Sequence, residues 1–401
     1  MMKKILHVLG PGIITAALVF GPSKMTITSK MGADYAYSLM WIVVVALFFM
    51  GIYTAMCSRI GATQSKSLLS LIKENFSKPI GIAIGIGVFL VATSFQAGNS
   101  IGVGIAIGEA TGTAPYIWVI SFTVIGISLL FFPSFYKVME KLMIGLVLLM
   151  LACFILTLFL VDIDFEQFSS GFIPSIPKGS MGLIIAFTAS CFSLVGAFYQ
   201  SYLIQERKKV LQQNISIPKA ERGAFVGVSI LGLMSAAVMI CAAAVLFPNG
   251  IHVGSAAEMG KALEPLFGRY ASSLFFIGLF GASFSSLVGN STVGGALLGD
   301  ALGFGSSLSS KKVKVLISIV MVLGCIVAVT FGKLPLELIV IAQSITIFLV
   351  PFIGISIFAI ANSKKVMGEH ANNWFYKLTG GLGLVVIFTL MISNVYDMFL
   401  K

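Results

Sequence analysis

Long apolar segments recur along the whole chain, and they leave few folds open to it. Each is long enough to cross, or nearly cross, the ~30 Å hydrocarbon core of a membrane as a helix. The polar connections between them are too short for a soluble domain, so we expect an all-α integral membrane protein whose single domain covers residues 1–401. Eleven transmembrane helices are predicted, at about residues 8–30, 35–58, 80–107, 115–132, 138–161, 181–205, 223–247, 270–299, 313–331, 334–361 and 376–399.

The distribution of charge supports a membrane protein and indicates its orientation. Charged residues make up 10% of the chain, against about 25% in soluble domains. Of 26 Lys and Arg residues, alternate connections place 19 on one side and 6 on the other, with Lys24 left inside the membrane. This asymmetry predicts a plasma-membrane protein with a cytoplasmic N-terminus and an extracellular C-terminus. The net charge of +11 is not gathered on a soluble face, so no nucleic-acid partner is expected.

The first apolar segment is interrupted by the residues Gly21-Pro22-Ser23-Lys24. A lysine at membrane depth costs about 2.5–3.5 kcal/mol, so such residues are rare and usually functional. Irregular backbone at this depth is tolerated where it lines a cavity. We therefore expect these four residues to form part of a substrate site. The alternative for Lys24 is a side chain that extends to the membrane interface.

The sixth segment carries a second interruption by small residues, around Gly196 and Ala197. Paired interruptions in corresponding spans are typical of inverted repeats with a binding site near the bilayer midplane. The sequence thus predicts repeats at about 8–161 and 181–361, an extra helix at 376–399, and unwound backbone near residues 21–24 and 195–198. Packing between helices is an equally good explanation for Gly196 alone.

Polar side chains also occur on otherwise apolar segments. Most are expected to form hydrogen bonds between helices. Asn290 and Gln343 are the better candidates for lining a cavity, because a buried amide without partners is more costly than a hydroxyl. A purely structural role remains the alternative for Asn290.

The sequence offers little for catalysis. It contains no phosphate-binding loop, no zinc-protease motif and no nucleophile placed beside a base, and no acid lies deep in a predicted span. We therefore expect neither an enzyme nor a bound cofactor.

Several short motifs occur at spacings that match a known family. They are Gly10-Pro11-Gly12, residues 58–61, Ala92-Thr93, Ser291-Thr292 with Gly295 and Gly299, and residues 362–368. With these motifs the chain resembles, over most of its length, the Nramp family of divalent-metal transporters. The resemblance implies the leucine-transporter fold, a 5+5 inverted repeat in which helices 1 and 6 are broken. It also implies secondary-active transport by alternating access.

The chain departs from that family at the residues that bind metal. The family's DPGN motif corresponds here to residues 21–24, so that Gly21 replaces the metal-binding Asp and Lys24 the metal-binding Asn. The family's MPH motif aligns with Gly196-Ala197-Phe198, which removes the Met ligand and the His. Of the residues that the family uses on metal, only Gln343 and backbone carbonyls remain. The comparison therefore predicts no metal site of the family's type.

These observations favour a carrier for a small anion, such as bicarbonate or a small carboxylate, coupled to H⁺ or Na⁺. A divalent cation about 6 Å from a lysine ammonium is repelled by roughly 5 kcal/mol at an effective dielectric constant near 20, whereas an anion is attracted. One alternative is a divalent-metal transporter for Mg²⁺ or Mn²⁺, and another is a non-transporting sensor on a transporter scaffold. The expected partners are the substrate, the coupling ion and the lipid bilayer.

Overall fold

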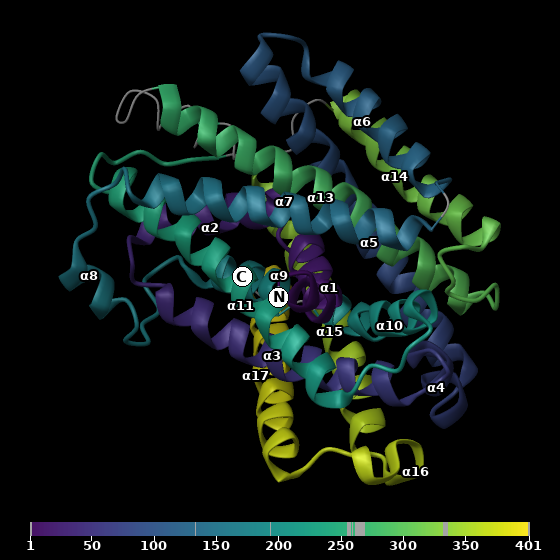
Figure 1. The fold of residues 1–401 in the computed structure, drawn as a ribbon. Helices are drawn as coiled ribbons and strands as arrows, with labels where there is room; N and C mark the ends of the chain where they lie inside the picture. The colour runs from purple at the N-terminus through teal and green to yellow at the C-terminus, as the bar shows by residue number, and fades with distance from the viewer. Residues whose placement is uncertain are drawn as a thin grey trace.

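The structure is a computed structural model that describes residues 2–399 apart from residues 133, 193, 255–257, 259, 261–268 and 332–335. Side chains are not described for residues 2–9, 269, 271, 336–345 and 397–399. Over the described part the regular structure is entirely helical (Figure 1). The longer helices are α1 (Met2–Val19), α2 (Pro22–Tyr35), α3 (Met40–Thr63), α5 (Lys78–Thr111), α6 (Pro115–Leu130), α7 (Phe135–Leu158), α9 (Met181–Cys191), α10 (Leu194–Leu211), α11 (Ile217–Val245), α13 (Arg269–Ala301), α14 (Lys311–Phe331), α15 (Leu336–Asn362) and α17 (Trp374–Phe399). Short connecting helices are α4 (Leu68–Asn75), α8 (Phe165–Ser170), α16 (Lys364–Met367) and η1 (Gly368–His370).

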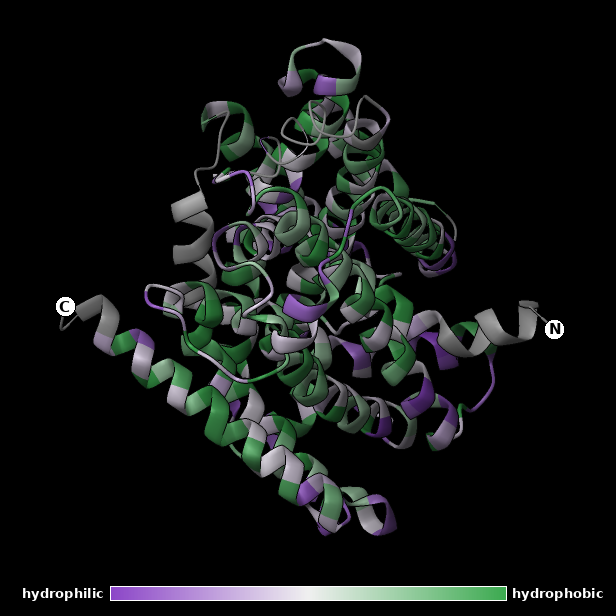
Figure 2. Cartoon of the chain, turned by 90° about the vertical axis from the view of Figure 1, so that its left-hand side faces the viewer, coloured by the Kyte–Doolittle hydropathy of each residue, from purple (hydrophilic) through white to green (hydrophobic). Residues whose placement is uncertain are grey.

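The composition and length of these helices suit a membrane. Eight helices in the described part are long and apolar enough to cross it, and a bent pair, Thr346–Asn362 with Lys364–His370, would add a ninth. Gly10–Val19 and Pro115–Leu130 are shorter apolar helices. Hydrophobic residues extend along most of the helices, and hydrophilic ones occur in short stretches (Figure 2). The expected all-α membrane fold is confirmed, and the count of eleven spans stays a prediction.

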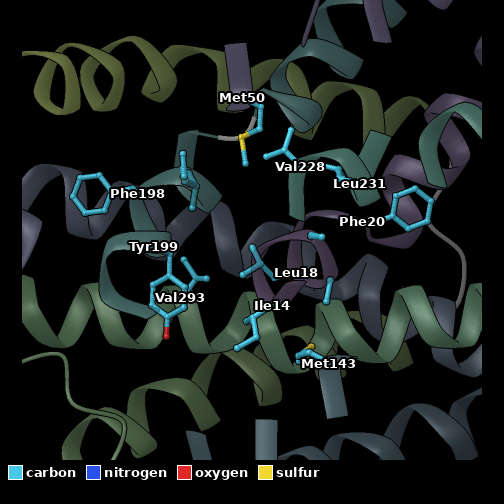
Figure 3. Packing of buried hydrophobic residues seen from close by; sticks show 14 of the residues in the cluster. Ile14, Leu18, Phe20, Met50, Met143, Phe198, Tyr199, Val228, Leu231 and Val293 are labelled. Carbon is cyan, nitrogen blue, oxygen red and sulfur yellow. The ribbon is translucent and has the colours of Figure 1, made fainter. Parts of the chain in front are cut away.

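Helix α1 lies at the centre of the bundle, where it contacts α7, α10, α11 and α13 (Figure 1). Its Ile14 and Leu18 side chains lie among residues of those four helices (Figure 3). α1 approaches α11 so closely that a Cβ atom on Gly12 would overlap the backbone of Gly223, and one on Gly227 would overlap the backbone of Gly12. Glycine at these positions lets the two backbones cross in contact. α6 and α14 form one edge of the bundle, and α16 and α17 lie at the opposite edge.

The first predicted span is interrupted between α1 and α2. Pro22 has no N–H to continue a hydrogen-bonded ladder, and it begins α2 as its first residue. Gly21 before it is extended, with φ −102° and ψ 177°. The break therefore covers only Phe20 and Gly21. Ser23 and Lys24 already belong to the first turn of α2, so the expectation of unwound backbone over 21–24 is wrong beyond Gly21.

The second interruption lies between α9 and α10, earlier than predicted. α9 ends at Cys191 and α10 begins at Leu194, so Gly196 and Ala197 are helical and the expected unwinding of 195–198 is wrong. An aromatic residue occupies the break: the Phe192 ring lies 5.8 Å from the Phe49 ring and 5.3 Å from the Tyr53 ring, measured between centroids. The described part of this break contains neither glycine nor proline, and its aromatic ring packs against α3.

Candidate functional site

A small cavity lies where the two interruptions meet α5, α13 and α15. Its volume is about 70 Å³. Since a water molecule needs roughly 10–15 Å³ on this measure, the cavity has room for a few waters or a substrate of a few heavy atoms. The lining residues are Leu18, Val19, Gly21, Ser23, Lys24, Val91, Phe95, Asn99, Ala189, Ser190, Val195, Gly196, Ser286, Asn290, Val293 and Thr346.

Lys24 is the charged residue of this lining. Its side chain is 1% exposed, and its Nζ atom has no hydrogen-bond partner among the described residues. The Nζ atom lies 5.3 Å from the centre of the Phe187 ring of α9, and the Cys191 thiol is also close to it. The side chain therefore points into the protein and does not extend to the membrane interface. A buried ammonium without a partner is unfavourable unless a ligand or water completes its contacts.

The backbone around Gly21 adds further polarity to the cavity. Gly21 caps α2 without a side-chain hydrogen bond, and in the first turn Ser23 and Lys24 have N–H groups without acceptors inside the helix. The positive end of the helix dipole lies at the same place. A Cβ atom on Gly21 would lie 2.9 Å from Ser286 Oγ and 3.2 Å from Asn99 Oδ1. A larger residue at this position would therefore require the Ser286 hydroxyl to shift.

The backbone carbonyl groups at the C-terminal end of α1 already have hydrogen-bond donors. The Ser285 hydroxyl donates to the Ala17 carbonyl at 3.0 Å, and the Ser286 hydroxyl lies 3.3 Å from the carbonyls of Ala17 and Leu18. These α13 hydroxyls thus cap the last carbonyls of α1. The groups at the break that still lack hydrogen-bond partners within their helix are therefore the N–H donors in the first turn of α2.

An amide cluster on α5 and α13 borders the cavity on another side. The cluster consists of Gln96, Asn99 and Asn290. Asn290 Nδ2 donates to the Ala92 carbonyl at 2.7 Å, and Gln96 Nε2 donates to the Leu287 carbonyl at 2.9 Å. Asn290 therefore has both roles that the sequence left open, because it joins two helices and also lines the cavity.

Of the eight predicted site residues, five line the cavity, two do not, and the side chain of the eighth lies outside the described residues. Those that line it are Gly21, Ser23, Lys24, Gly196 and Asn290.

Of the other three, Pro22 packs on α5, where a Cβ atom on Gly102 would lie 3.0 Å from its ring. Ala197 is completely buried in α10, away from the cavity. The Gln343 side chain lies outside the described residues.

Sequence reasoning missed four polar residues of the lining: Asn99, Ser190, Ser286 and Thr346. Asn99 could have been found, since the argument that favoured Asn290 applies to any buried amide.

The structure also bears on metal ligation. In the part of the chain that it describes, no group of three or more His, Cys, Asp or Glu residues is arranged to hold a metal ion.

Comparison with known sequences connects this chain to transporters. The family described as "Natural resistance-associated macrophage protein-like" matches residues 12–397. Among curated relatives, the "Divalent metal cation transporter MntH" of Caldanaerobacter subterraneus subsp. tengcongensis is 25% identical over 98% of this chain and 93% of that protein. The protein of the same name from Deinococcus radiodurans is 23% identical over 97% of this chain and 89% of that protein.

Solved structures agree with the fold. The Eremococcus coleocola manganese transporter, crystallised with an aromatic bis-isothiourea substituted compound, has a TM-score of 0.80 at 19% identity, with 99% of this chain and 88% of that chain covered. Mhp1, a nucleobase-cation-symport-1 family transporter, has a TM-score of 0.64 at 13% identity, covering 98% of this chain and 94% of that one. At such identities the likeness concerns the fold alone, and it confirms the leucine-transporter-like architecture.

Proposed function

This chain belongs to the natural resistance-associated macrophage protein (Nramp) family of secondary transporters, and from that premise we propose that it carries a small anion rather than a metal cation. The substrate would occupy the cavity between the two helix interruptions. Bicarbonate or a small carboxylate fits the available volume of about 70 Å³. We place it in the plasma membrane, and the positive-inside distribution of Lys and Arg favours a cytoplasmic N-terminus and an extracellular C-terminus.

The observation that carries this proposal is the buried Lys24 ammonium, which has no hydrogen-bond partner among the described residues. A bound anion would neutralise it and would also accept hydrogen bonds from the first-turn N–H groups of α2. Charge-assisted contacts of this kind are about twice as strong as neutral ones. The lining offers no carboxylate that could neutralise Lys24 in place of a substrate.

The remaining lining residues would orient the substrate. Gly21 and Gly196 allow the backbone to approach it closely, and Asn290 would supply a directional hydrogen bond. Gln343 belongs to α15, whose Thr346 lines the cavity, and we retain it as a candidate ligand. Coupling would be to H⁺ or Na⁺.

Alternating access requires a closure that can open, and one candidate lies beyond the cavity along α10 and α13. Asp300 accepts hydrogen bonds from Tyr202 at 2.7 Å and from Ser67 at 2.5 Å, and Lys73 donates to the Asp300 carbonyl at 2.5 Å. These contacts join α4, α10 and α13. By the predicted orientation this end faces the cytoplasm, so opening toward the cytoplasm would break them.

A divalent metal cation is the second candidate substrate, and the names of the curated relatives favour it. Its best case is a hydrated Mg²⁺, which keeps several waters and needs few protein ligands. Such an ion would use backbone carbonyls, Gln343 and amide oxygens near Lys24. Against it are the repulsion by Lys24 and the lack of a carboxylate among the lining residues.

Uptake by the purified protein in liposomes separates the two candidates. One panel contains bicarbonate, formate, acetate and lactate, and the other contains Mn²⁺, Mg²⁺ and Cd²⁺. We expect saturable anion uptake that is lost in Lys24→Met, and no saturable uptake of metal. Saturable Mn²⁺ or Mg²⁺ uptake by the parent protein, without any anion uptake, would show that the anion proposal is wrong.

A further inference from the structure

The hydrogen bonds of the amide cluster determine which atoms Asn290 presents to the cavity. Backbone carbonyls accept hydrogen bonds and cannot donate them. Asn290 Nδ2 lies 2.7 Å from the Ala92 carbonyl, so the nitrogen of this side chain must be on that side. Its second N–H points toward Gln96 Oε1, at 3.5 Å. Both donors of Asn290 are therefore directed at α5, and its Oδ1 atom is the polar atom left for a ligand.

The same reasoning orients Asn99. Gln96 Nε2 donates to the Leu287 carbonyl at 2.9 Å, so the other end of the Gln96 amide is the acceptor Oε1. Asn99 Nδ2 lies 3.3 Å from this oxygen and donates to it. Asn99 Oδ1 then lies on the other branch of the side chain, beside Gly21, where it would be 3.2 Å from a Cβ atom. Asn99 and Asn290, both lining residues, thus offer carbonyl oxygens.

The cavity consequently presents two chemically different sets of polar groups. Lys24 and the first-turn N–H groups of α2 are donors, whereas Asn99 Oδ1 and Asn290 Oδ1 are acceptors. A bare anion such as chloride, nitrate or formate satisfies only the donors. Its negative charge would also face two carbonyl dipoles that point their negative ends at it.

The geometry points to a substrate that is a hydroxyl-bearing monoanion, of which bicarbonate is the member that best fits the volume. Its charged oxygens would face Lys24 and α2, and its O–H would donate to Asn99 Oδ1. Asn99 is thereby assigned as a residue that determines specificity. This inference rests on the proposed anion transport and narrows its substrate class.

Nitrate provides the matched probe, because it is a planar monoanion with three oxygens, like bicarbonate, but has no hydroxyl group. A site that hydrogen-bonds a substrate hydroxyl rejects an analogue without one, because its own polar groups are then left unpaired. We expect the protein to bind bicarbonate at least tenfold more tightly than nitrate. The measurement is calorimetric titration of the purified protein with the sodium salts, with liposome uptake of each ion alongside.

The contribution of Asn99 is tested with Asn99→Leu, which has a similar volume and no polar atom. It should bring the affinity for bicarbonate down to that for nitrate and leave the nitrate affinity nearly unchanged. Ser94→Ala is the matched control on the same helix, since Ser94 is exposed and its hydroxyl bonds only within α5. This control should keep the parental preference. If Asn99→Leu does not fold, the preference of the parent protein still decides the question.

The possible outcomes separate this inference from the proposed function. Equal binding and uptake of nitrate and bicarbonate would overturn the inference and leave anion transport standing. Uptake of metal alone would overturn both. An Asn99→Leu protein that keeps its preference for bicarbonate, but no longer depends on Na⁺, would also overturn the inference, because the oxygens would then bind a coupling cation.

Discussion

Among the described residues, Lys24 and Arg207 are the two cations that are at most 2% exposed, and their surroundings are opposite. Arg207 on α10 is 2% exposed, and its Nη1 atom lies 2.8 Å from Glu140 Oε1 on α7. Lys24 is 1% exposed, and its Nζ atom has no hydrogen-bond partner among the described residues. Arg207 is therefore neutralised by the protein itself, whereas Lys24 lines a cavity and depends on what enters it.

The packing around Arg207 is consistent with a structural role. Gly10 of α1 lies directly over the Arg207–Glu140 pair, so closely that a Cβ atom would overlap both side chains. Burial alone is thus a poor guide to function in this bundle. A buried charge becomes a candidate binding residue when its partner is missing and a cavity adjoins it.

The largest effect is expected from separating the paired charges. Arg207→Met leaves Glu140, whose side chain is 18% exposed, next to α1 without its partner. Breaking a fully buried pair costs about 3–5 kcal/mol, and we expect the lower end of this range here. Thermal unfolding in detergent should show a large fall in the midpoint, with low expression. The double variant Arg207→Met with Glu140→Met should recover most of that loss, because replacing both charges by apolar side chains is often neutral. A stable single variant would mean that the pair is no part of the structural core.

The corresponding change at the other cation should affect transport and not stability. Lys24→Met removes a buried charge that has no partner, so the unfolding midpoint should stay level or rise. Loss of a hydrogen bond to a charged group is worth about 1.5–3 kcal/mol, which lowers substrate affinity roughly ten- to a hundredfold. Binding and uptake of the identified substrate measure this loss.

Lys24→Arg is the matched variant for charge. It keeps the positive charge but replaces a compact ammonium with a planar guanidinium, which the small cavity accommodates poorly. Affinity should fall, though less than in Lys24→Met. If Lys24→Met transports like the parent, the lack of a partner for Lys24 does not mark a substrate site, and the site assignment is wrong.

A smaller effect is expected where glycine replaces the family's aspartate. Gly21→Asp places a Cβ atom 2.9 Å from Ser286 Oγ, and overpacking of this kind costs about 1–3 kcal/mol. The variant should unfold at a lower temperature than the parent and should not gain Mn²⁺ uptake. Gly21→Ala separates crowding from charge, because it adds the Cβ atom alone. Micromolar Mn²⁺ binding by Gly21→Asp, measured by calorimetry, would show that Lys24 tolerates a metal nearby.

The structural features that the sequence predicted are those that depend on the chemistry of neighbouring residues in the chain. The break at Gly21-Pro22 was predictable because proline ends a ladder of hydrogen bonds by itself. The position of the second break, at Phe192, was not predictable, because no glycine or proline marks it and the contacts of its ring with α3 exist only in the folded chain. The exposure of Asn99 to the cavity depends on how α5 is rotated against α13. The pairing of Arg207 with Glu140 joins two distant helices, and the sequence indicated only that Arg207 follows an apolar segment.

The smallest effect should come from an ion pair with a similar distance between its charged atoms but in a different environment. Lys66 Nζ lies 2.7 Å from Glu74 Oε1, as close as the Arg207–Glu140 contact, but the two side chains are 58% and 50% exposed. Exposed pairs contribute about 0–1 kcal/mol, since water already solvates both charges. Lys66→Met should therefore shift the unfolding midpoint little, and added salt should remove even that shift. A loss as large as that of Arg207→Met would contradict the role of burial in the comparison, because distance alone would then set the strength of both pairs.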